Sequence, residues 1–180
     1  MLLTVEEIRE QLDNKFFPLG DDFDDLRLLN RDKPLLNIKL AESKLNISFP
    51  ELFVSFLSTY NLDNFSLCNI SFGNGSDYLD MLIEINTEDN FNKWWIGEKR
   101  PVEYIVIAMS DPYTILLNTI TGQIFSMTSE SLMDDFVPIA SDFVFFFRGI
   151  GTLFLTKEAP DLIAKLVSSQ TIEFWDELSN

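Results

Sequence analysis

The segment from Ser48 to Asn61 constrains the fold most, because it has the pattern of a helix buried along one face. Pro50 falls in a first helical turn, where its missing N–H is harmless, and Ser48 with Glu51 three residues later forms a capping-box pattern. Apolar side chains then recur at helical spacing; they are Phe53, Phe56, Leu57 and Tyr60. The segment therefore predicts a helix docked on a hydrophobic core.

Another capping-box pattern opens the chain, and a long acidic connection follows it. Thr4 with Glu7 predicts a first helix over about residues 5–14, with its apolar side chains on one face. The aromatic run 16–20, which contains Pro and Gly, ends that helix. An acidic link with little periodicity is then expected from residue 21 to about residue 39.

Apolar runs bounded by turn residues predict a meander of strands in the middle of the chain. The expected strands are residues 65–72, 78–85, 102–109, 113–118, 123–127 and 137–140. Gly122 stands where a hairpin turn favours a positive φ. Pro138 places the last of these segments at a sheet edge or in a loop.

Further helices are expected after the strands. Ser141 or Asp142 caps the first of them, and Thr171 caps a short last one. Gly149 and Gly151 are expected to weaken the end of the first helix by about 1 kcal/mol each relative to Ala.

Helices, then strands, then helices predict a single α+β domain over residues 1–180. It comprises a helical part at about 4–60, a sheet at about 65–140 and C-terminal helices at about 141–178. The sheet is expected to be twisted and mostly antiparallel, with about five to six strands. The helices from Ser48 and Ser141 are expected to pack on one face of it. The expected core residues are Phe53, Phe56, Ile107, Leu116, Ile124, Phe143 and Phe146.

Net charge is the second strong constraint, since 13 Lys and Arg stand against 29 Asp and Glu, for a formal charge of −16. Such a surface repels the phosphates of nucleic acids and of anionic lipids, which are bound through Lys and Arg. It attracts a basic protein partner and speeds the encounter. Plain solubility is the competing explanation for the charge.

The sequence also bears on location. Its longest apolar run, residues 143–147, is far shorter than the ~20 residues of a membrane span. The first residues turn acidic and lack a basic segment, so no signal peptide is expected. The only Cys, Cys68, cannot form an internal disulfide, which suits a reducing compartment. A cytoplasmic protein is therefore expected.

Histidine is absent, which removes the commonest general base, nucleophile partner and transition-metal ligand. Cys68 lies in an alternating segment with no cation nearby in sequence, so a structural thiol is favoured over a nucleophile. The acidic run 21–25 lacks the ligand spacing of a calcium loop, and no dinucleotide or P-loop pattern is present. We therefore predict no catalytic residue, no metal and no cofactor.

Carboxylate chemistry is the enzymatic alternative that remains. A glycosidase or a metal-dependent hydrolase requires two or more acids to converge in a deep cleft. The candidates for such a pair are Asp21, Asp22, Glu130, Asp134 and Asp135.

Aromatic residues flank the polar run 98–100; they are Phe91, Trp94, Trp95 and Tyr104. A stacking platform for sugars or bases is one interpretation, but core packing is the ordinary role, and the negative charge argues against nucleic acid. Trp94 and Trp95 are adjacent, so in extended backbone they face opposite ways and at most one lies in the same core. The other is a candidate interface residue.

The order of these motifs resembles the SUKH superfamily, which joins fungal regulators of cell-wall synthesis with bacterial toxin-immunity proteins. The helix motif of that family is matched by Phe49-Pro50, Phe53, Phe56-Leu57 and Asn61. Its later motifs are matched by Val106-Ile107-Ala108, Ser110-Asp111-Pro112, Leu116-Leu117-Asn118, Thr121-Gly122, Ile124-Phe125 and Ala140-Ser141-Asp142-Phe143. The resemblance covers about residues 48–152. It fails at Asn61-Leu62, where the family has Asn-Gly, and at Asp111-Pro112-Tyr113, where the family has a Gly-rich turn.

The resemblance implies a non-catalytic protein that binds and occludes a cognate toxin domain. The charge favours a basic toxin of the nuclease type, because a surface at −16 mimics the phosphates that a nuclease binds. The expected partner contacts are Asp22, Asp24, Asp25, Trp94, Trp95, Glu130, Asp134 and Asp135. An intracellular scaffold or regulatory adaptor of the cell-wall-regulator type is the alternative, and a carboxylate-based hydrolase is the second alternative.

Overall fold

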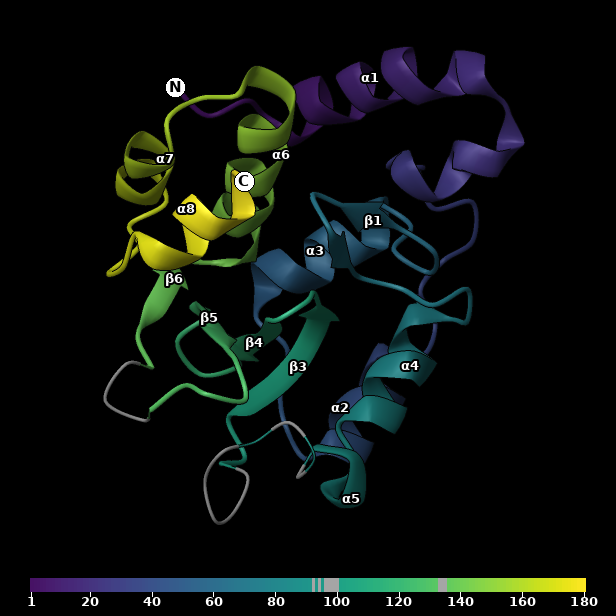
Figure 1. Cartoon of the computed structure of the whole chain (residues 1–180). Coiled ribbons are helices and arrows are strands. Elements are labelled where there is room, and N and C mark those ends of the chain that lie inside the picture. Colours follow the sequence, from purple (N-terminus) through teal and green to yellow (C-terminus); the bar gives the residue numbers. More distant parts are fainter. Residues whose placement is uncertain (92, 94, 96–100, 133–135) are drawn as a thin grey trace.

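An antiparallel sheet whose strands follow one another in sequence order forms the centre of the fold (Figure 1). The computed structural model describes the whole chain except residues 92, 94, 96–100 and 133–135. Within the described part the sheet has six strands: β1 (Ser66–Leu67), β2 (Ile70–Ser71), β3 (Tyr104–Met109), β4 (Thr114–Asn118), β5 (Ile124–Met127) and β6 (Pro138–Ala140). Every neighbouring pair is antiparallel, so the predicted sheet type and strand number are confirmed.

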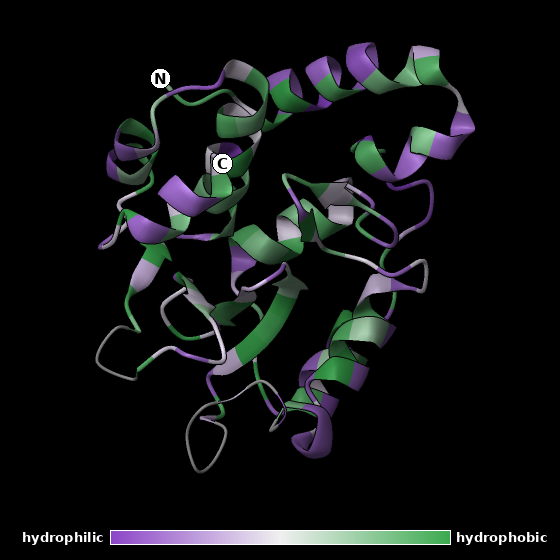
Figure 2. Ribbon diagram, in the orientation of Figure 1, coloured by the Kyte–Doolittle hydropathy of each residue, from purple (hydrophilic) through white to green (hydrophobic). Residues whose placement is uncertain are grey.

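Helices precede, interrupt and follow the strands, as an α+β fold requires. Before the sheet lie α1 (Val5–Phe16), the 3₁₀ helices η1 (Phe17–Leu19) and η2 (Asp21–Leu26), α2 (Ile38–Leu45) and α3 (Glu51–Thr59). Between β2 and β3 lie α4 (Tyr78–Ile85) and α5 (Glu88–Phe91). After β6 come α6 (Phe143–Thr156), α7 (Pro160–Leu166) and α8 (Glu173–Leu178). In Figure 2, β3 is hydrophobic along most of its length, while α5 is largely hydrophilic.

Both faces of the central strands are buried, and the side chains alternate between two hydrophobic clusters. Ile105 and Ile107 of β3 belong to the large cluster beneath the helices, whereas Val106 between them belongs to a second cluster on the opposite face. On β4, Leu116 likewise belongs to the second cluster, while both of its neighbours belong to the first. All seven predicted core residues are buried, but they divide between the two faces.

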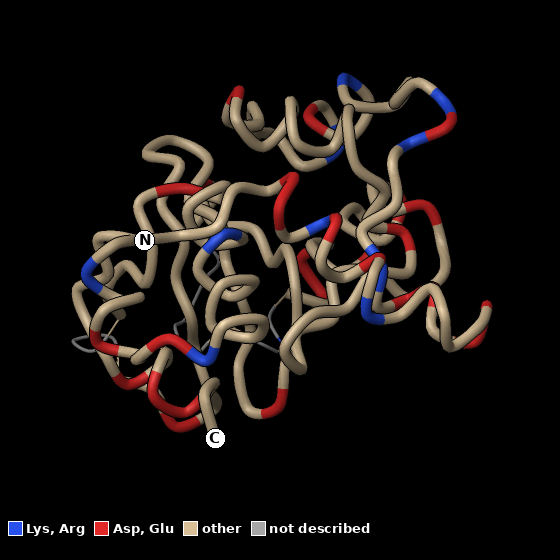
Figure 3. Tube along the Cα trace, turned by 90° about the horizontal axis from the view of Figure 1, so that it is seen from above, with Lys and Arg blue, Asp and Glu red and all other residues tan. Residues whose placement is uncertain are grey.

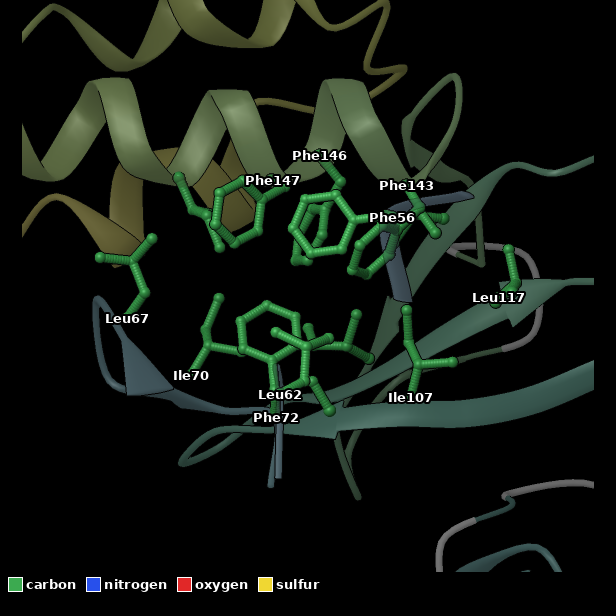
Figure 4. Packing of buried hydrophobic residues seen from close by; sticks show 14 of the residues in the cluster. Phe56, Leu62, Leu67, Ile70, Phe72, Ile107, Leu117, Phe143, Phe146 and Phe147 are labelled. Carbon is green, nitrogen blue, oxygen red and sulfur yellow. The ribbon is translucent and has the colours of Figure 1, made fainter. Parts of the chain in front are cut away.

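Aromatic side chains join α3 to α6 above the sheet (Figure 4). The Phe143 ring centre lies 4.8 Å from that of Phe53 and 5.0 Å from that of Phe56, both at edge-to-face angles. Phe56 also packs against Phe147 at 4.8 Å. Such pairs contribute about 0.5–1.5 kcal/mol beyond their burial. The expectation that these two helices share one face of the sheet is confirmed.

Asp142 begins α6, since its Oδ1 atom accepts a hydrogen bond from the Phe145 N–H at 2.8 Å. The two glycines of this helix do not lie at its end, as the sequence suggested, but inside it. A Cβ atom at Gly149 would lie 2.6 Å from the Trp175 ring, and one at Gly151 would lie 2.5 Å from Ile8 Cδ1. The glycines therefore allow α8 and α1 to approach α6 closely.

Replacing Gly151 with Ala should destabilise the protein, although Ala is the better helix former. The clash with Ile8, an overpacking cost of about 1–3 kcal/mol, outweighs the ~1 kcal/mol gain in helix propensity and leaves a net loss of up to about 2 kcal/mol in the free energy of unfolding. Urea unfolding measures this loss. Ile8→Ala removes the side chain that the new methyl group would strike. The Gly151→Ala, Ile8→Ala double variant should therefore lose less stability than the sum of the losses in the two single variants. Additive costs would contradict the close contact.

Helix α3 does not use the predicted capping box. It begins at Glu51 with Pro50 at the N-cap position, and no side chain there accepts a hydrogen bond. The N–H of Phe49 instead donates to Glu42 Oε1 at 2.9 Å. Glu42 lies on α2, a helix that begins where the expected acidic link ends and that the sequence analysis did not predict. A tertiary contact thus replaces the local cap.

Glu42 should make stability depend on pH. Burial raises the pKa of its carboxyl, but hydrogen bonds from Lys39 and from the Phe49 N–H outweigh burial and leave the pKa below its ordinary value. A carboxyl whose pKa is lowered on folding stabilises the folded protein at pH values above its pKa in the unfolded chain, which is about 4.3. This stabilisation is lost as the pH falls. Glu42→Gln should therefore cost about 1 kcal/mol at neutral pH and progressively less below about pH 4.

Urea unfolding at a series of pH values measures this difference. Glu84→Gln is the control, because Glu84 is exposed and no hydrogen bond or ion pair of its side chain is found among the described residues. A cost at Glu42 that does not change with pH would contradict the assignment.

Two predicted strands are wrong. Residues 65–72 form a hairpin, β1 and β2, in which Cys68 and Asn69 adopt positive φ angles of 54° and 63°, the geometry of a type I′ turn. Residues 78–85 form helix α4, because Asp77 caps it through the N–H groups of Leu79 and Asp80 at 2.9 and 3.2 Å. Its buried residues then face the core at helical spacing.

Candidate partner-binding surface

The acidic run predicted to contact a partner forms η2, which follows the end of α1 (Figure 1). Pro18 lies in η1, and Gly20 with a φ of 97° turns the chain into η2. This turn brings Asp22, Asp24 and Asp25 together on a single 3₁₀ helix. The three predicted acids of this run therefore lie close to one another.

Large apolar side chains are exposed on the same segment, which the sequence analysis did not predict. Phe17 is 64% exposed, Leu19 is 56% exposed and Phe23 is 38% exposed. We call the set Phe17, Leu19, Asp21, Asp22, Phe23 and Asp25 the 17–25 surface. Exposed aromatic residues edged by charged ones are typical of protein interfaces.

Arg27 holds this surface to the body of the protein. Its Nη2 atom lies 2.6 Å from Asp13 Oδ1 and its Nη1 atom lies 2.6 Å from Asp24 Oδ1, while its guanidinium carbon lies 4.7 Å from the centre of the Phe17 ring. Asp24 is therefore engaged in holding the segment in place. Asp21, Asp22 and Asp25 have no Lys or Arg nitrogen within 4 Å among the described residues.

Glu130 lies in a different place, in a hollow of 450 Å³ beside α8. Glu173 and Glu177 of α8 line the same hollow, and sequence reasoning missed both because more than 40 residues separate them from Glu130. The Tyr113 hydroxyl donates to Glu177 Oε2 at 2.5 Å. Burial and this carboxylate raise the pKa of Tyr113, so its hydroxyl stays protonated and remains a donor.

The hydrolase alternative requires at least two of its five candidate acids to converge in a cleft. Of the five acids proposed for it, only Glu130 is found among the described lining residues, while Asp134 and Asp135 lie outside the described residues. No group of three or more potential metal-ligating acids or thiols occurs in the described ranges.

Of the adjacent residues Trp94 and Trp95, the structure describes Trp95 alone. Trp95 is 8% exposed and packs in the second cluster, with its ring centre 5.7 Å from Phe91 and 6.0 Å from Tyr104. A buried ring of this kind offers little surface to a partner, so we do not place Trp95 in the partner-binding surface. Trp94 lies outside the described residues.

Cys68 lies in the hairpin turn and not in a strand, and its thiol donates weakly to Leu178 O at 3.8 Å. Burial raises the pKa of Cys68 to about 11, so the thiol stays protonated at neutral pH. This agrees with a structural thiol and argues against a nucleophile.

Alkylation tests this assignment. At pH 8 the folded protein should react with iodoacetamide more than about 100-fold more slowly than a free thiol, because so little thiolate is present. The rate should rise until the pH approaches 11, and unfolding in urea should restore the ordinary rate. Rapid stoichiometric reaction of the folded protein at neutral pH would show an activated cysteine instead.

Across the described ranges, no helix is both long enough and apolar enough to cross a bilayer.

The amino-acid sequence matches a known family model over residues 35–149, which is more than half of the chain. The model is that of the SMI1/KNR4 family, SUKH-1. This chain belongs to the SMI1/KNR4 family. The family includes toxin-immunity proteins and SMI1/KNR4-like regulators, and its members are generally non-catalytic. A search of curated protein sequences found no match.

The match divides this SMI1/KNR4 family chain into two parts. The sheet and helix α3 lie within residues 35–149, whereas the 17–25 surface, α7 and α8 lie outside them. The 17–25 surface therefore belongs to a part of the chain that the family pattern does not specify.

Proposed function

We propose that this protein is an immunity protein that binds and occludes a basic toxin domain of the nuclease type in the cytoplasm. The observation that carries the proposal is the 17–25 surface, where exposed aromatic and aliphatic side chains lie beside three carboxylates that have no Lys or Arg nitrogen within 4 Å among the described residues. Family membership supports a protein partner, because the family includes toxin-immunity proteins.

The negative charge of the protein is largely directed outward. Ion pairs between described residues involve only five carboxylates, those of Glu6, Asp13, Asp24, Glu42 and Asp63. Figure 3 shows Asp and Glu over many elements, with few Lys and Arg among them. Because most of the field is not cancelled within the protein, it accelerates encounter with a basic partner.

Attraction and occlusion have the same physical origin in this proposal. A nuclease holds the phosphates of its substrate with Lys and Arg. Carboxylates of the 17–25 surface would pair with those cations, and Phe17, Leu19 and Phe23 would supply apolar contacts that slow dissociation. Blocking the cationic site requires no catalysis by the immunity protein.

A regulatory adaptor is the second candidate, because the same family also contains SMI1/KNR4-like regulators. Such an adaptor could use the same surface for a different protein. A gene for a secreted toxin directly upstream favours the immunity function, whereas neighbouring cell-wall or signalling genes favour the adaptor.

Charge reversal distinguishes direct contacts of the 17–25 surface from the effect of the overall negative charge. Asp21, Asp22 and Asp25 are changed together to Lys, and association with the toxin domain encoded upstream is measured by surface plasmon resonance. At low salt the association rate should fall about 10-fold or more, and the difference should shrink as salt screens the charges. The melting temperature should change little, because none of the three acids is found in an ion pair with a described residue.

The matched control reverses Asp80, Glu84 and Glu88, three exposed acids of α4 and α5, and changes the net charge equally. Leu19→Ser should raise the dissociation rate, whereas Leu52→Ser, at a similar 51% exposure, should not. Equal effects of both charge reversals would show that the 17–25 surface is not the site. Absence of toxin binding by the unmodified protein would overturn the proposed function.

A further inference from the structure

A second surface contains a buried cation with too few partners. The Arg31 side chain is only 8% exposed, yet among the described residues it donates one hydrogen bond, from Nε to Leu57 O at 2.8 Å. Its buried Nη2 atom has no hydrogen-bond partner in the described part of the chain, and its ion pair with Asp63 Oδ1 is long, at 3.6 Å. Buried guanidinium groups normally use several of their five N–H donors. Nη2 is fully enclosed, whereas Nη1 is not among the fully buried atoms and has no hydrogen bond to a described residue.

Arg31 lines a hollow of 630 Å³ between the segment 31–37 and the start of α4. The walls are held by main-chain bonds, since the Arg31 N–H donates to Thr59 O at 2.9 Å and the Asn61 N–H donates to Leu29 O at 2.8 Å. The hollow is therefore a fixed feature of the fold. None of its lining residues belongs to the 17–25 surface.

Three other polar residues of the hollow each have one side-chain atom in a hydrogen bond and a second polar atom without one. Asn61 Oδ1 accepts from the Asp63 N–H at 2.8 Å, Asp63 Oδ1 accepts from the Tyr78 N–H at 3.0 Å, and Asp77 Oδ1 caps α4. Within the described ranges, Asn61 Nδ2 and the Oδ2 atoms of Asp63 and Asp77 have no partner. The hollow thus offers donors and acceptors together.

The charges select among possible occupants. Asp32, Asp63 and Asp77 would repel a phosphate or another small anion, while Arg31 and Lys33 would repel a metal cation. An extended peptide with a basic residue presents a carbonyl acceptor for Arg31 and a cationic donor for Asp63 and Asp77 at the same time. Exposed Leu36 and Pro34 add an apolar wall for one of its side chains.

We propose that this hollow binds an extended peptide segment of a protein partner, with a main-chain carbonyl on Arg31 and a Lys or Arg side chain on Asp63 and Asp77. The identity of the partner as a basic toxin rests on the proposed function, but binding of such a segment does not. The site would give the partner a second point of attachment, separate from the 17–25 surface.

Titration of ¹⁵N-labelled full-length protein tests the site directly. The probe is the peptide acetyl-Ala-Leu-Lys-Ala-amide, compared with the same peptide carrying Glu in place of Lys and with inorganic phosphate. The Lys peptide should shift the side-chain signals of Arg31 and Asn61 at millimolar concentration, with affinity about 10-fold or more above that of the Glu peptide. Equal binding of the Glu peptide or of phosphate, or shifts located elsewhere, would overturn the proposal.

Two variants test whether the peptide and the protein partner use the same hollow. Arg31→Lys keeps the charge but loses the planar fork, and should weaken binding of the Lys peptide about 10-fold. Leu36→Ser should weaken it without affecting folding, because Leu36 is 83% exposed. Ile120→Ser is the matched control at 81% exposure in a different part of the chain.

The same variants separate this inference from the proposed function. If the toxin binds the Leu36→Ser and Ile120→Ser variants equally well, the hollow is not a point of attachment, although the immunity function stands. If the Lys peptide binds the hollow while the toxin does not bind the protein, the hollow stands and the proposed function fails.

Discussion

One side-chain amide supplies hydrogen bonds to β3 along the edge of that strand where β2 does not pair with it. Asn86 accepts a hydrogen bond from the Val106 N–H at 2.7 Å and donates one to the Val106 carbonyl at 2.9 Å, the pair of bonds that an antiparallel neighbour would supply. The Tyr78 hydroxyl donates to the next carbonyl, that of Ile107, at 2.8 Å. Because β2 pairs with β3 only at Met109, these side chains satisfy buried main-chain groups that would otherwise lack partners. Helix α4 can therefore lie where a longer strand would be expected.

The position of α4 in turn determines the hollow around Arg31. Tyr78 is fixed through its hydroxyl on β3, so the start of the helix is held against the segment that follows α3. Asp63 accepts from the Tyr78 N–H, and Asp77 caps the helix, which places both carboxylates at one wall of the hollow. A contact that completes the sheet thus also arranges the groups that we propose for peptide binding. The 17–25 surface is independent of it, because Arg27 anchors that surface to α1.

The sequence predicted the elements whose signals are local and missed those decided by distant contacts. Strands β3 to β5 and helix α6 have apolar runs, turn residues and a cap in the sequence itself, and they formed as expected. Residues 78–85 have an apolar run that fits a strand or a helix. The cap at Asp77 favours the helix, and hydrogen bonds to β3 hold it in place. At the candidate surface, composition indicated Asp22 and Asp25. Tertiary packing decides that Phe17 and Phe23 are exposed and that Trp95 is buried, and no local sequence pattern predicts this.

The carboxylates of this chain fall into two groups with different physical roles. Asp24, Glu42, Asp77 and Asp142 each accept a hydrogen bond from a main-chain N–H or from Arg27, and those bonds help to hold the fold. Asp21, Asp22 and Asp25 are found in no ion pair with a described residue, so they add to the self-repulsion of a chain at −16. Solubility alone would be served by acids placed anywhere on the surface. Their position beside exposed Phe17 and Phe23 is one that the proposed binding role uses and that solubility does not require.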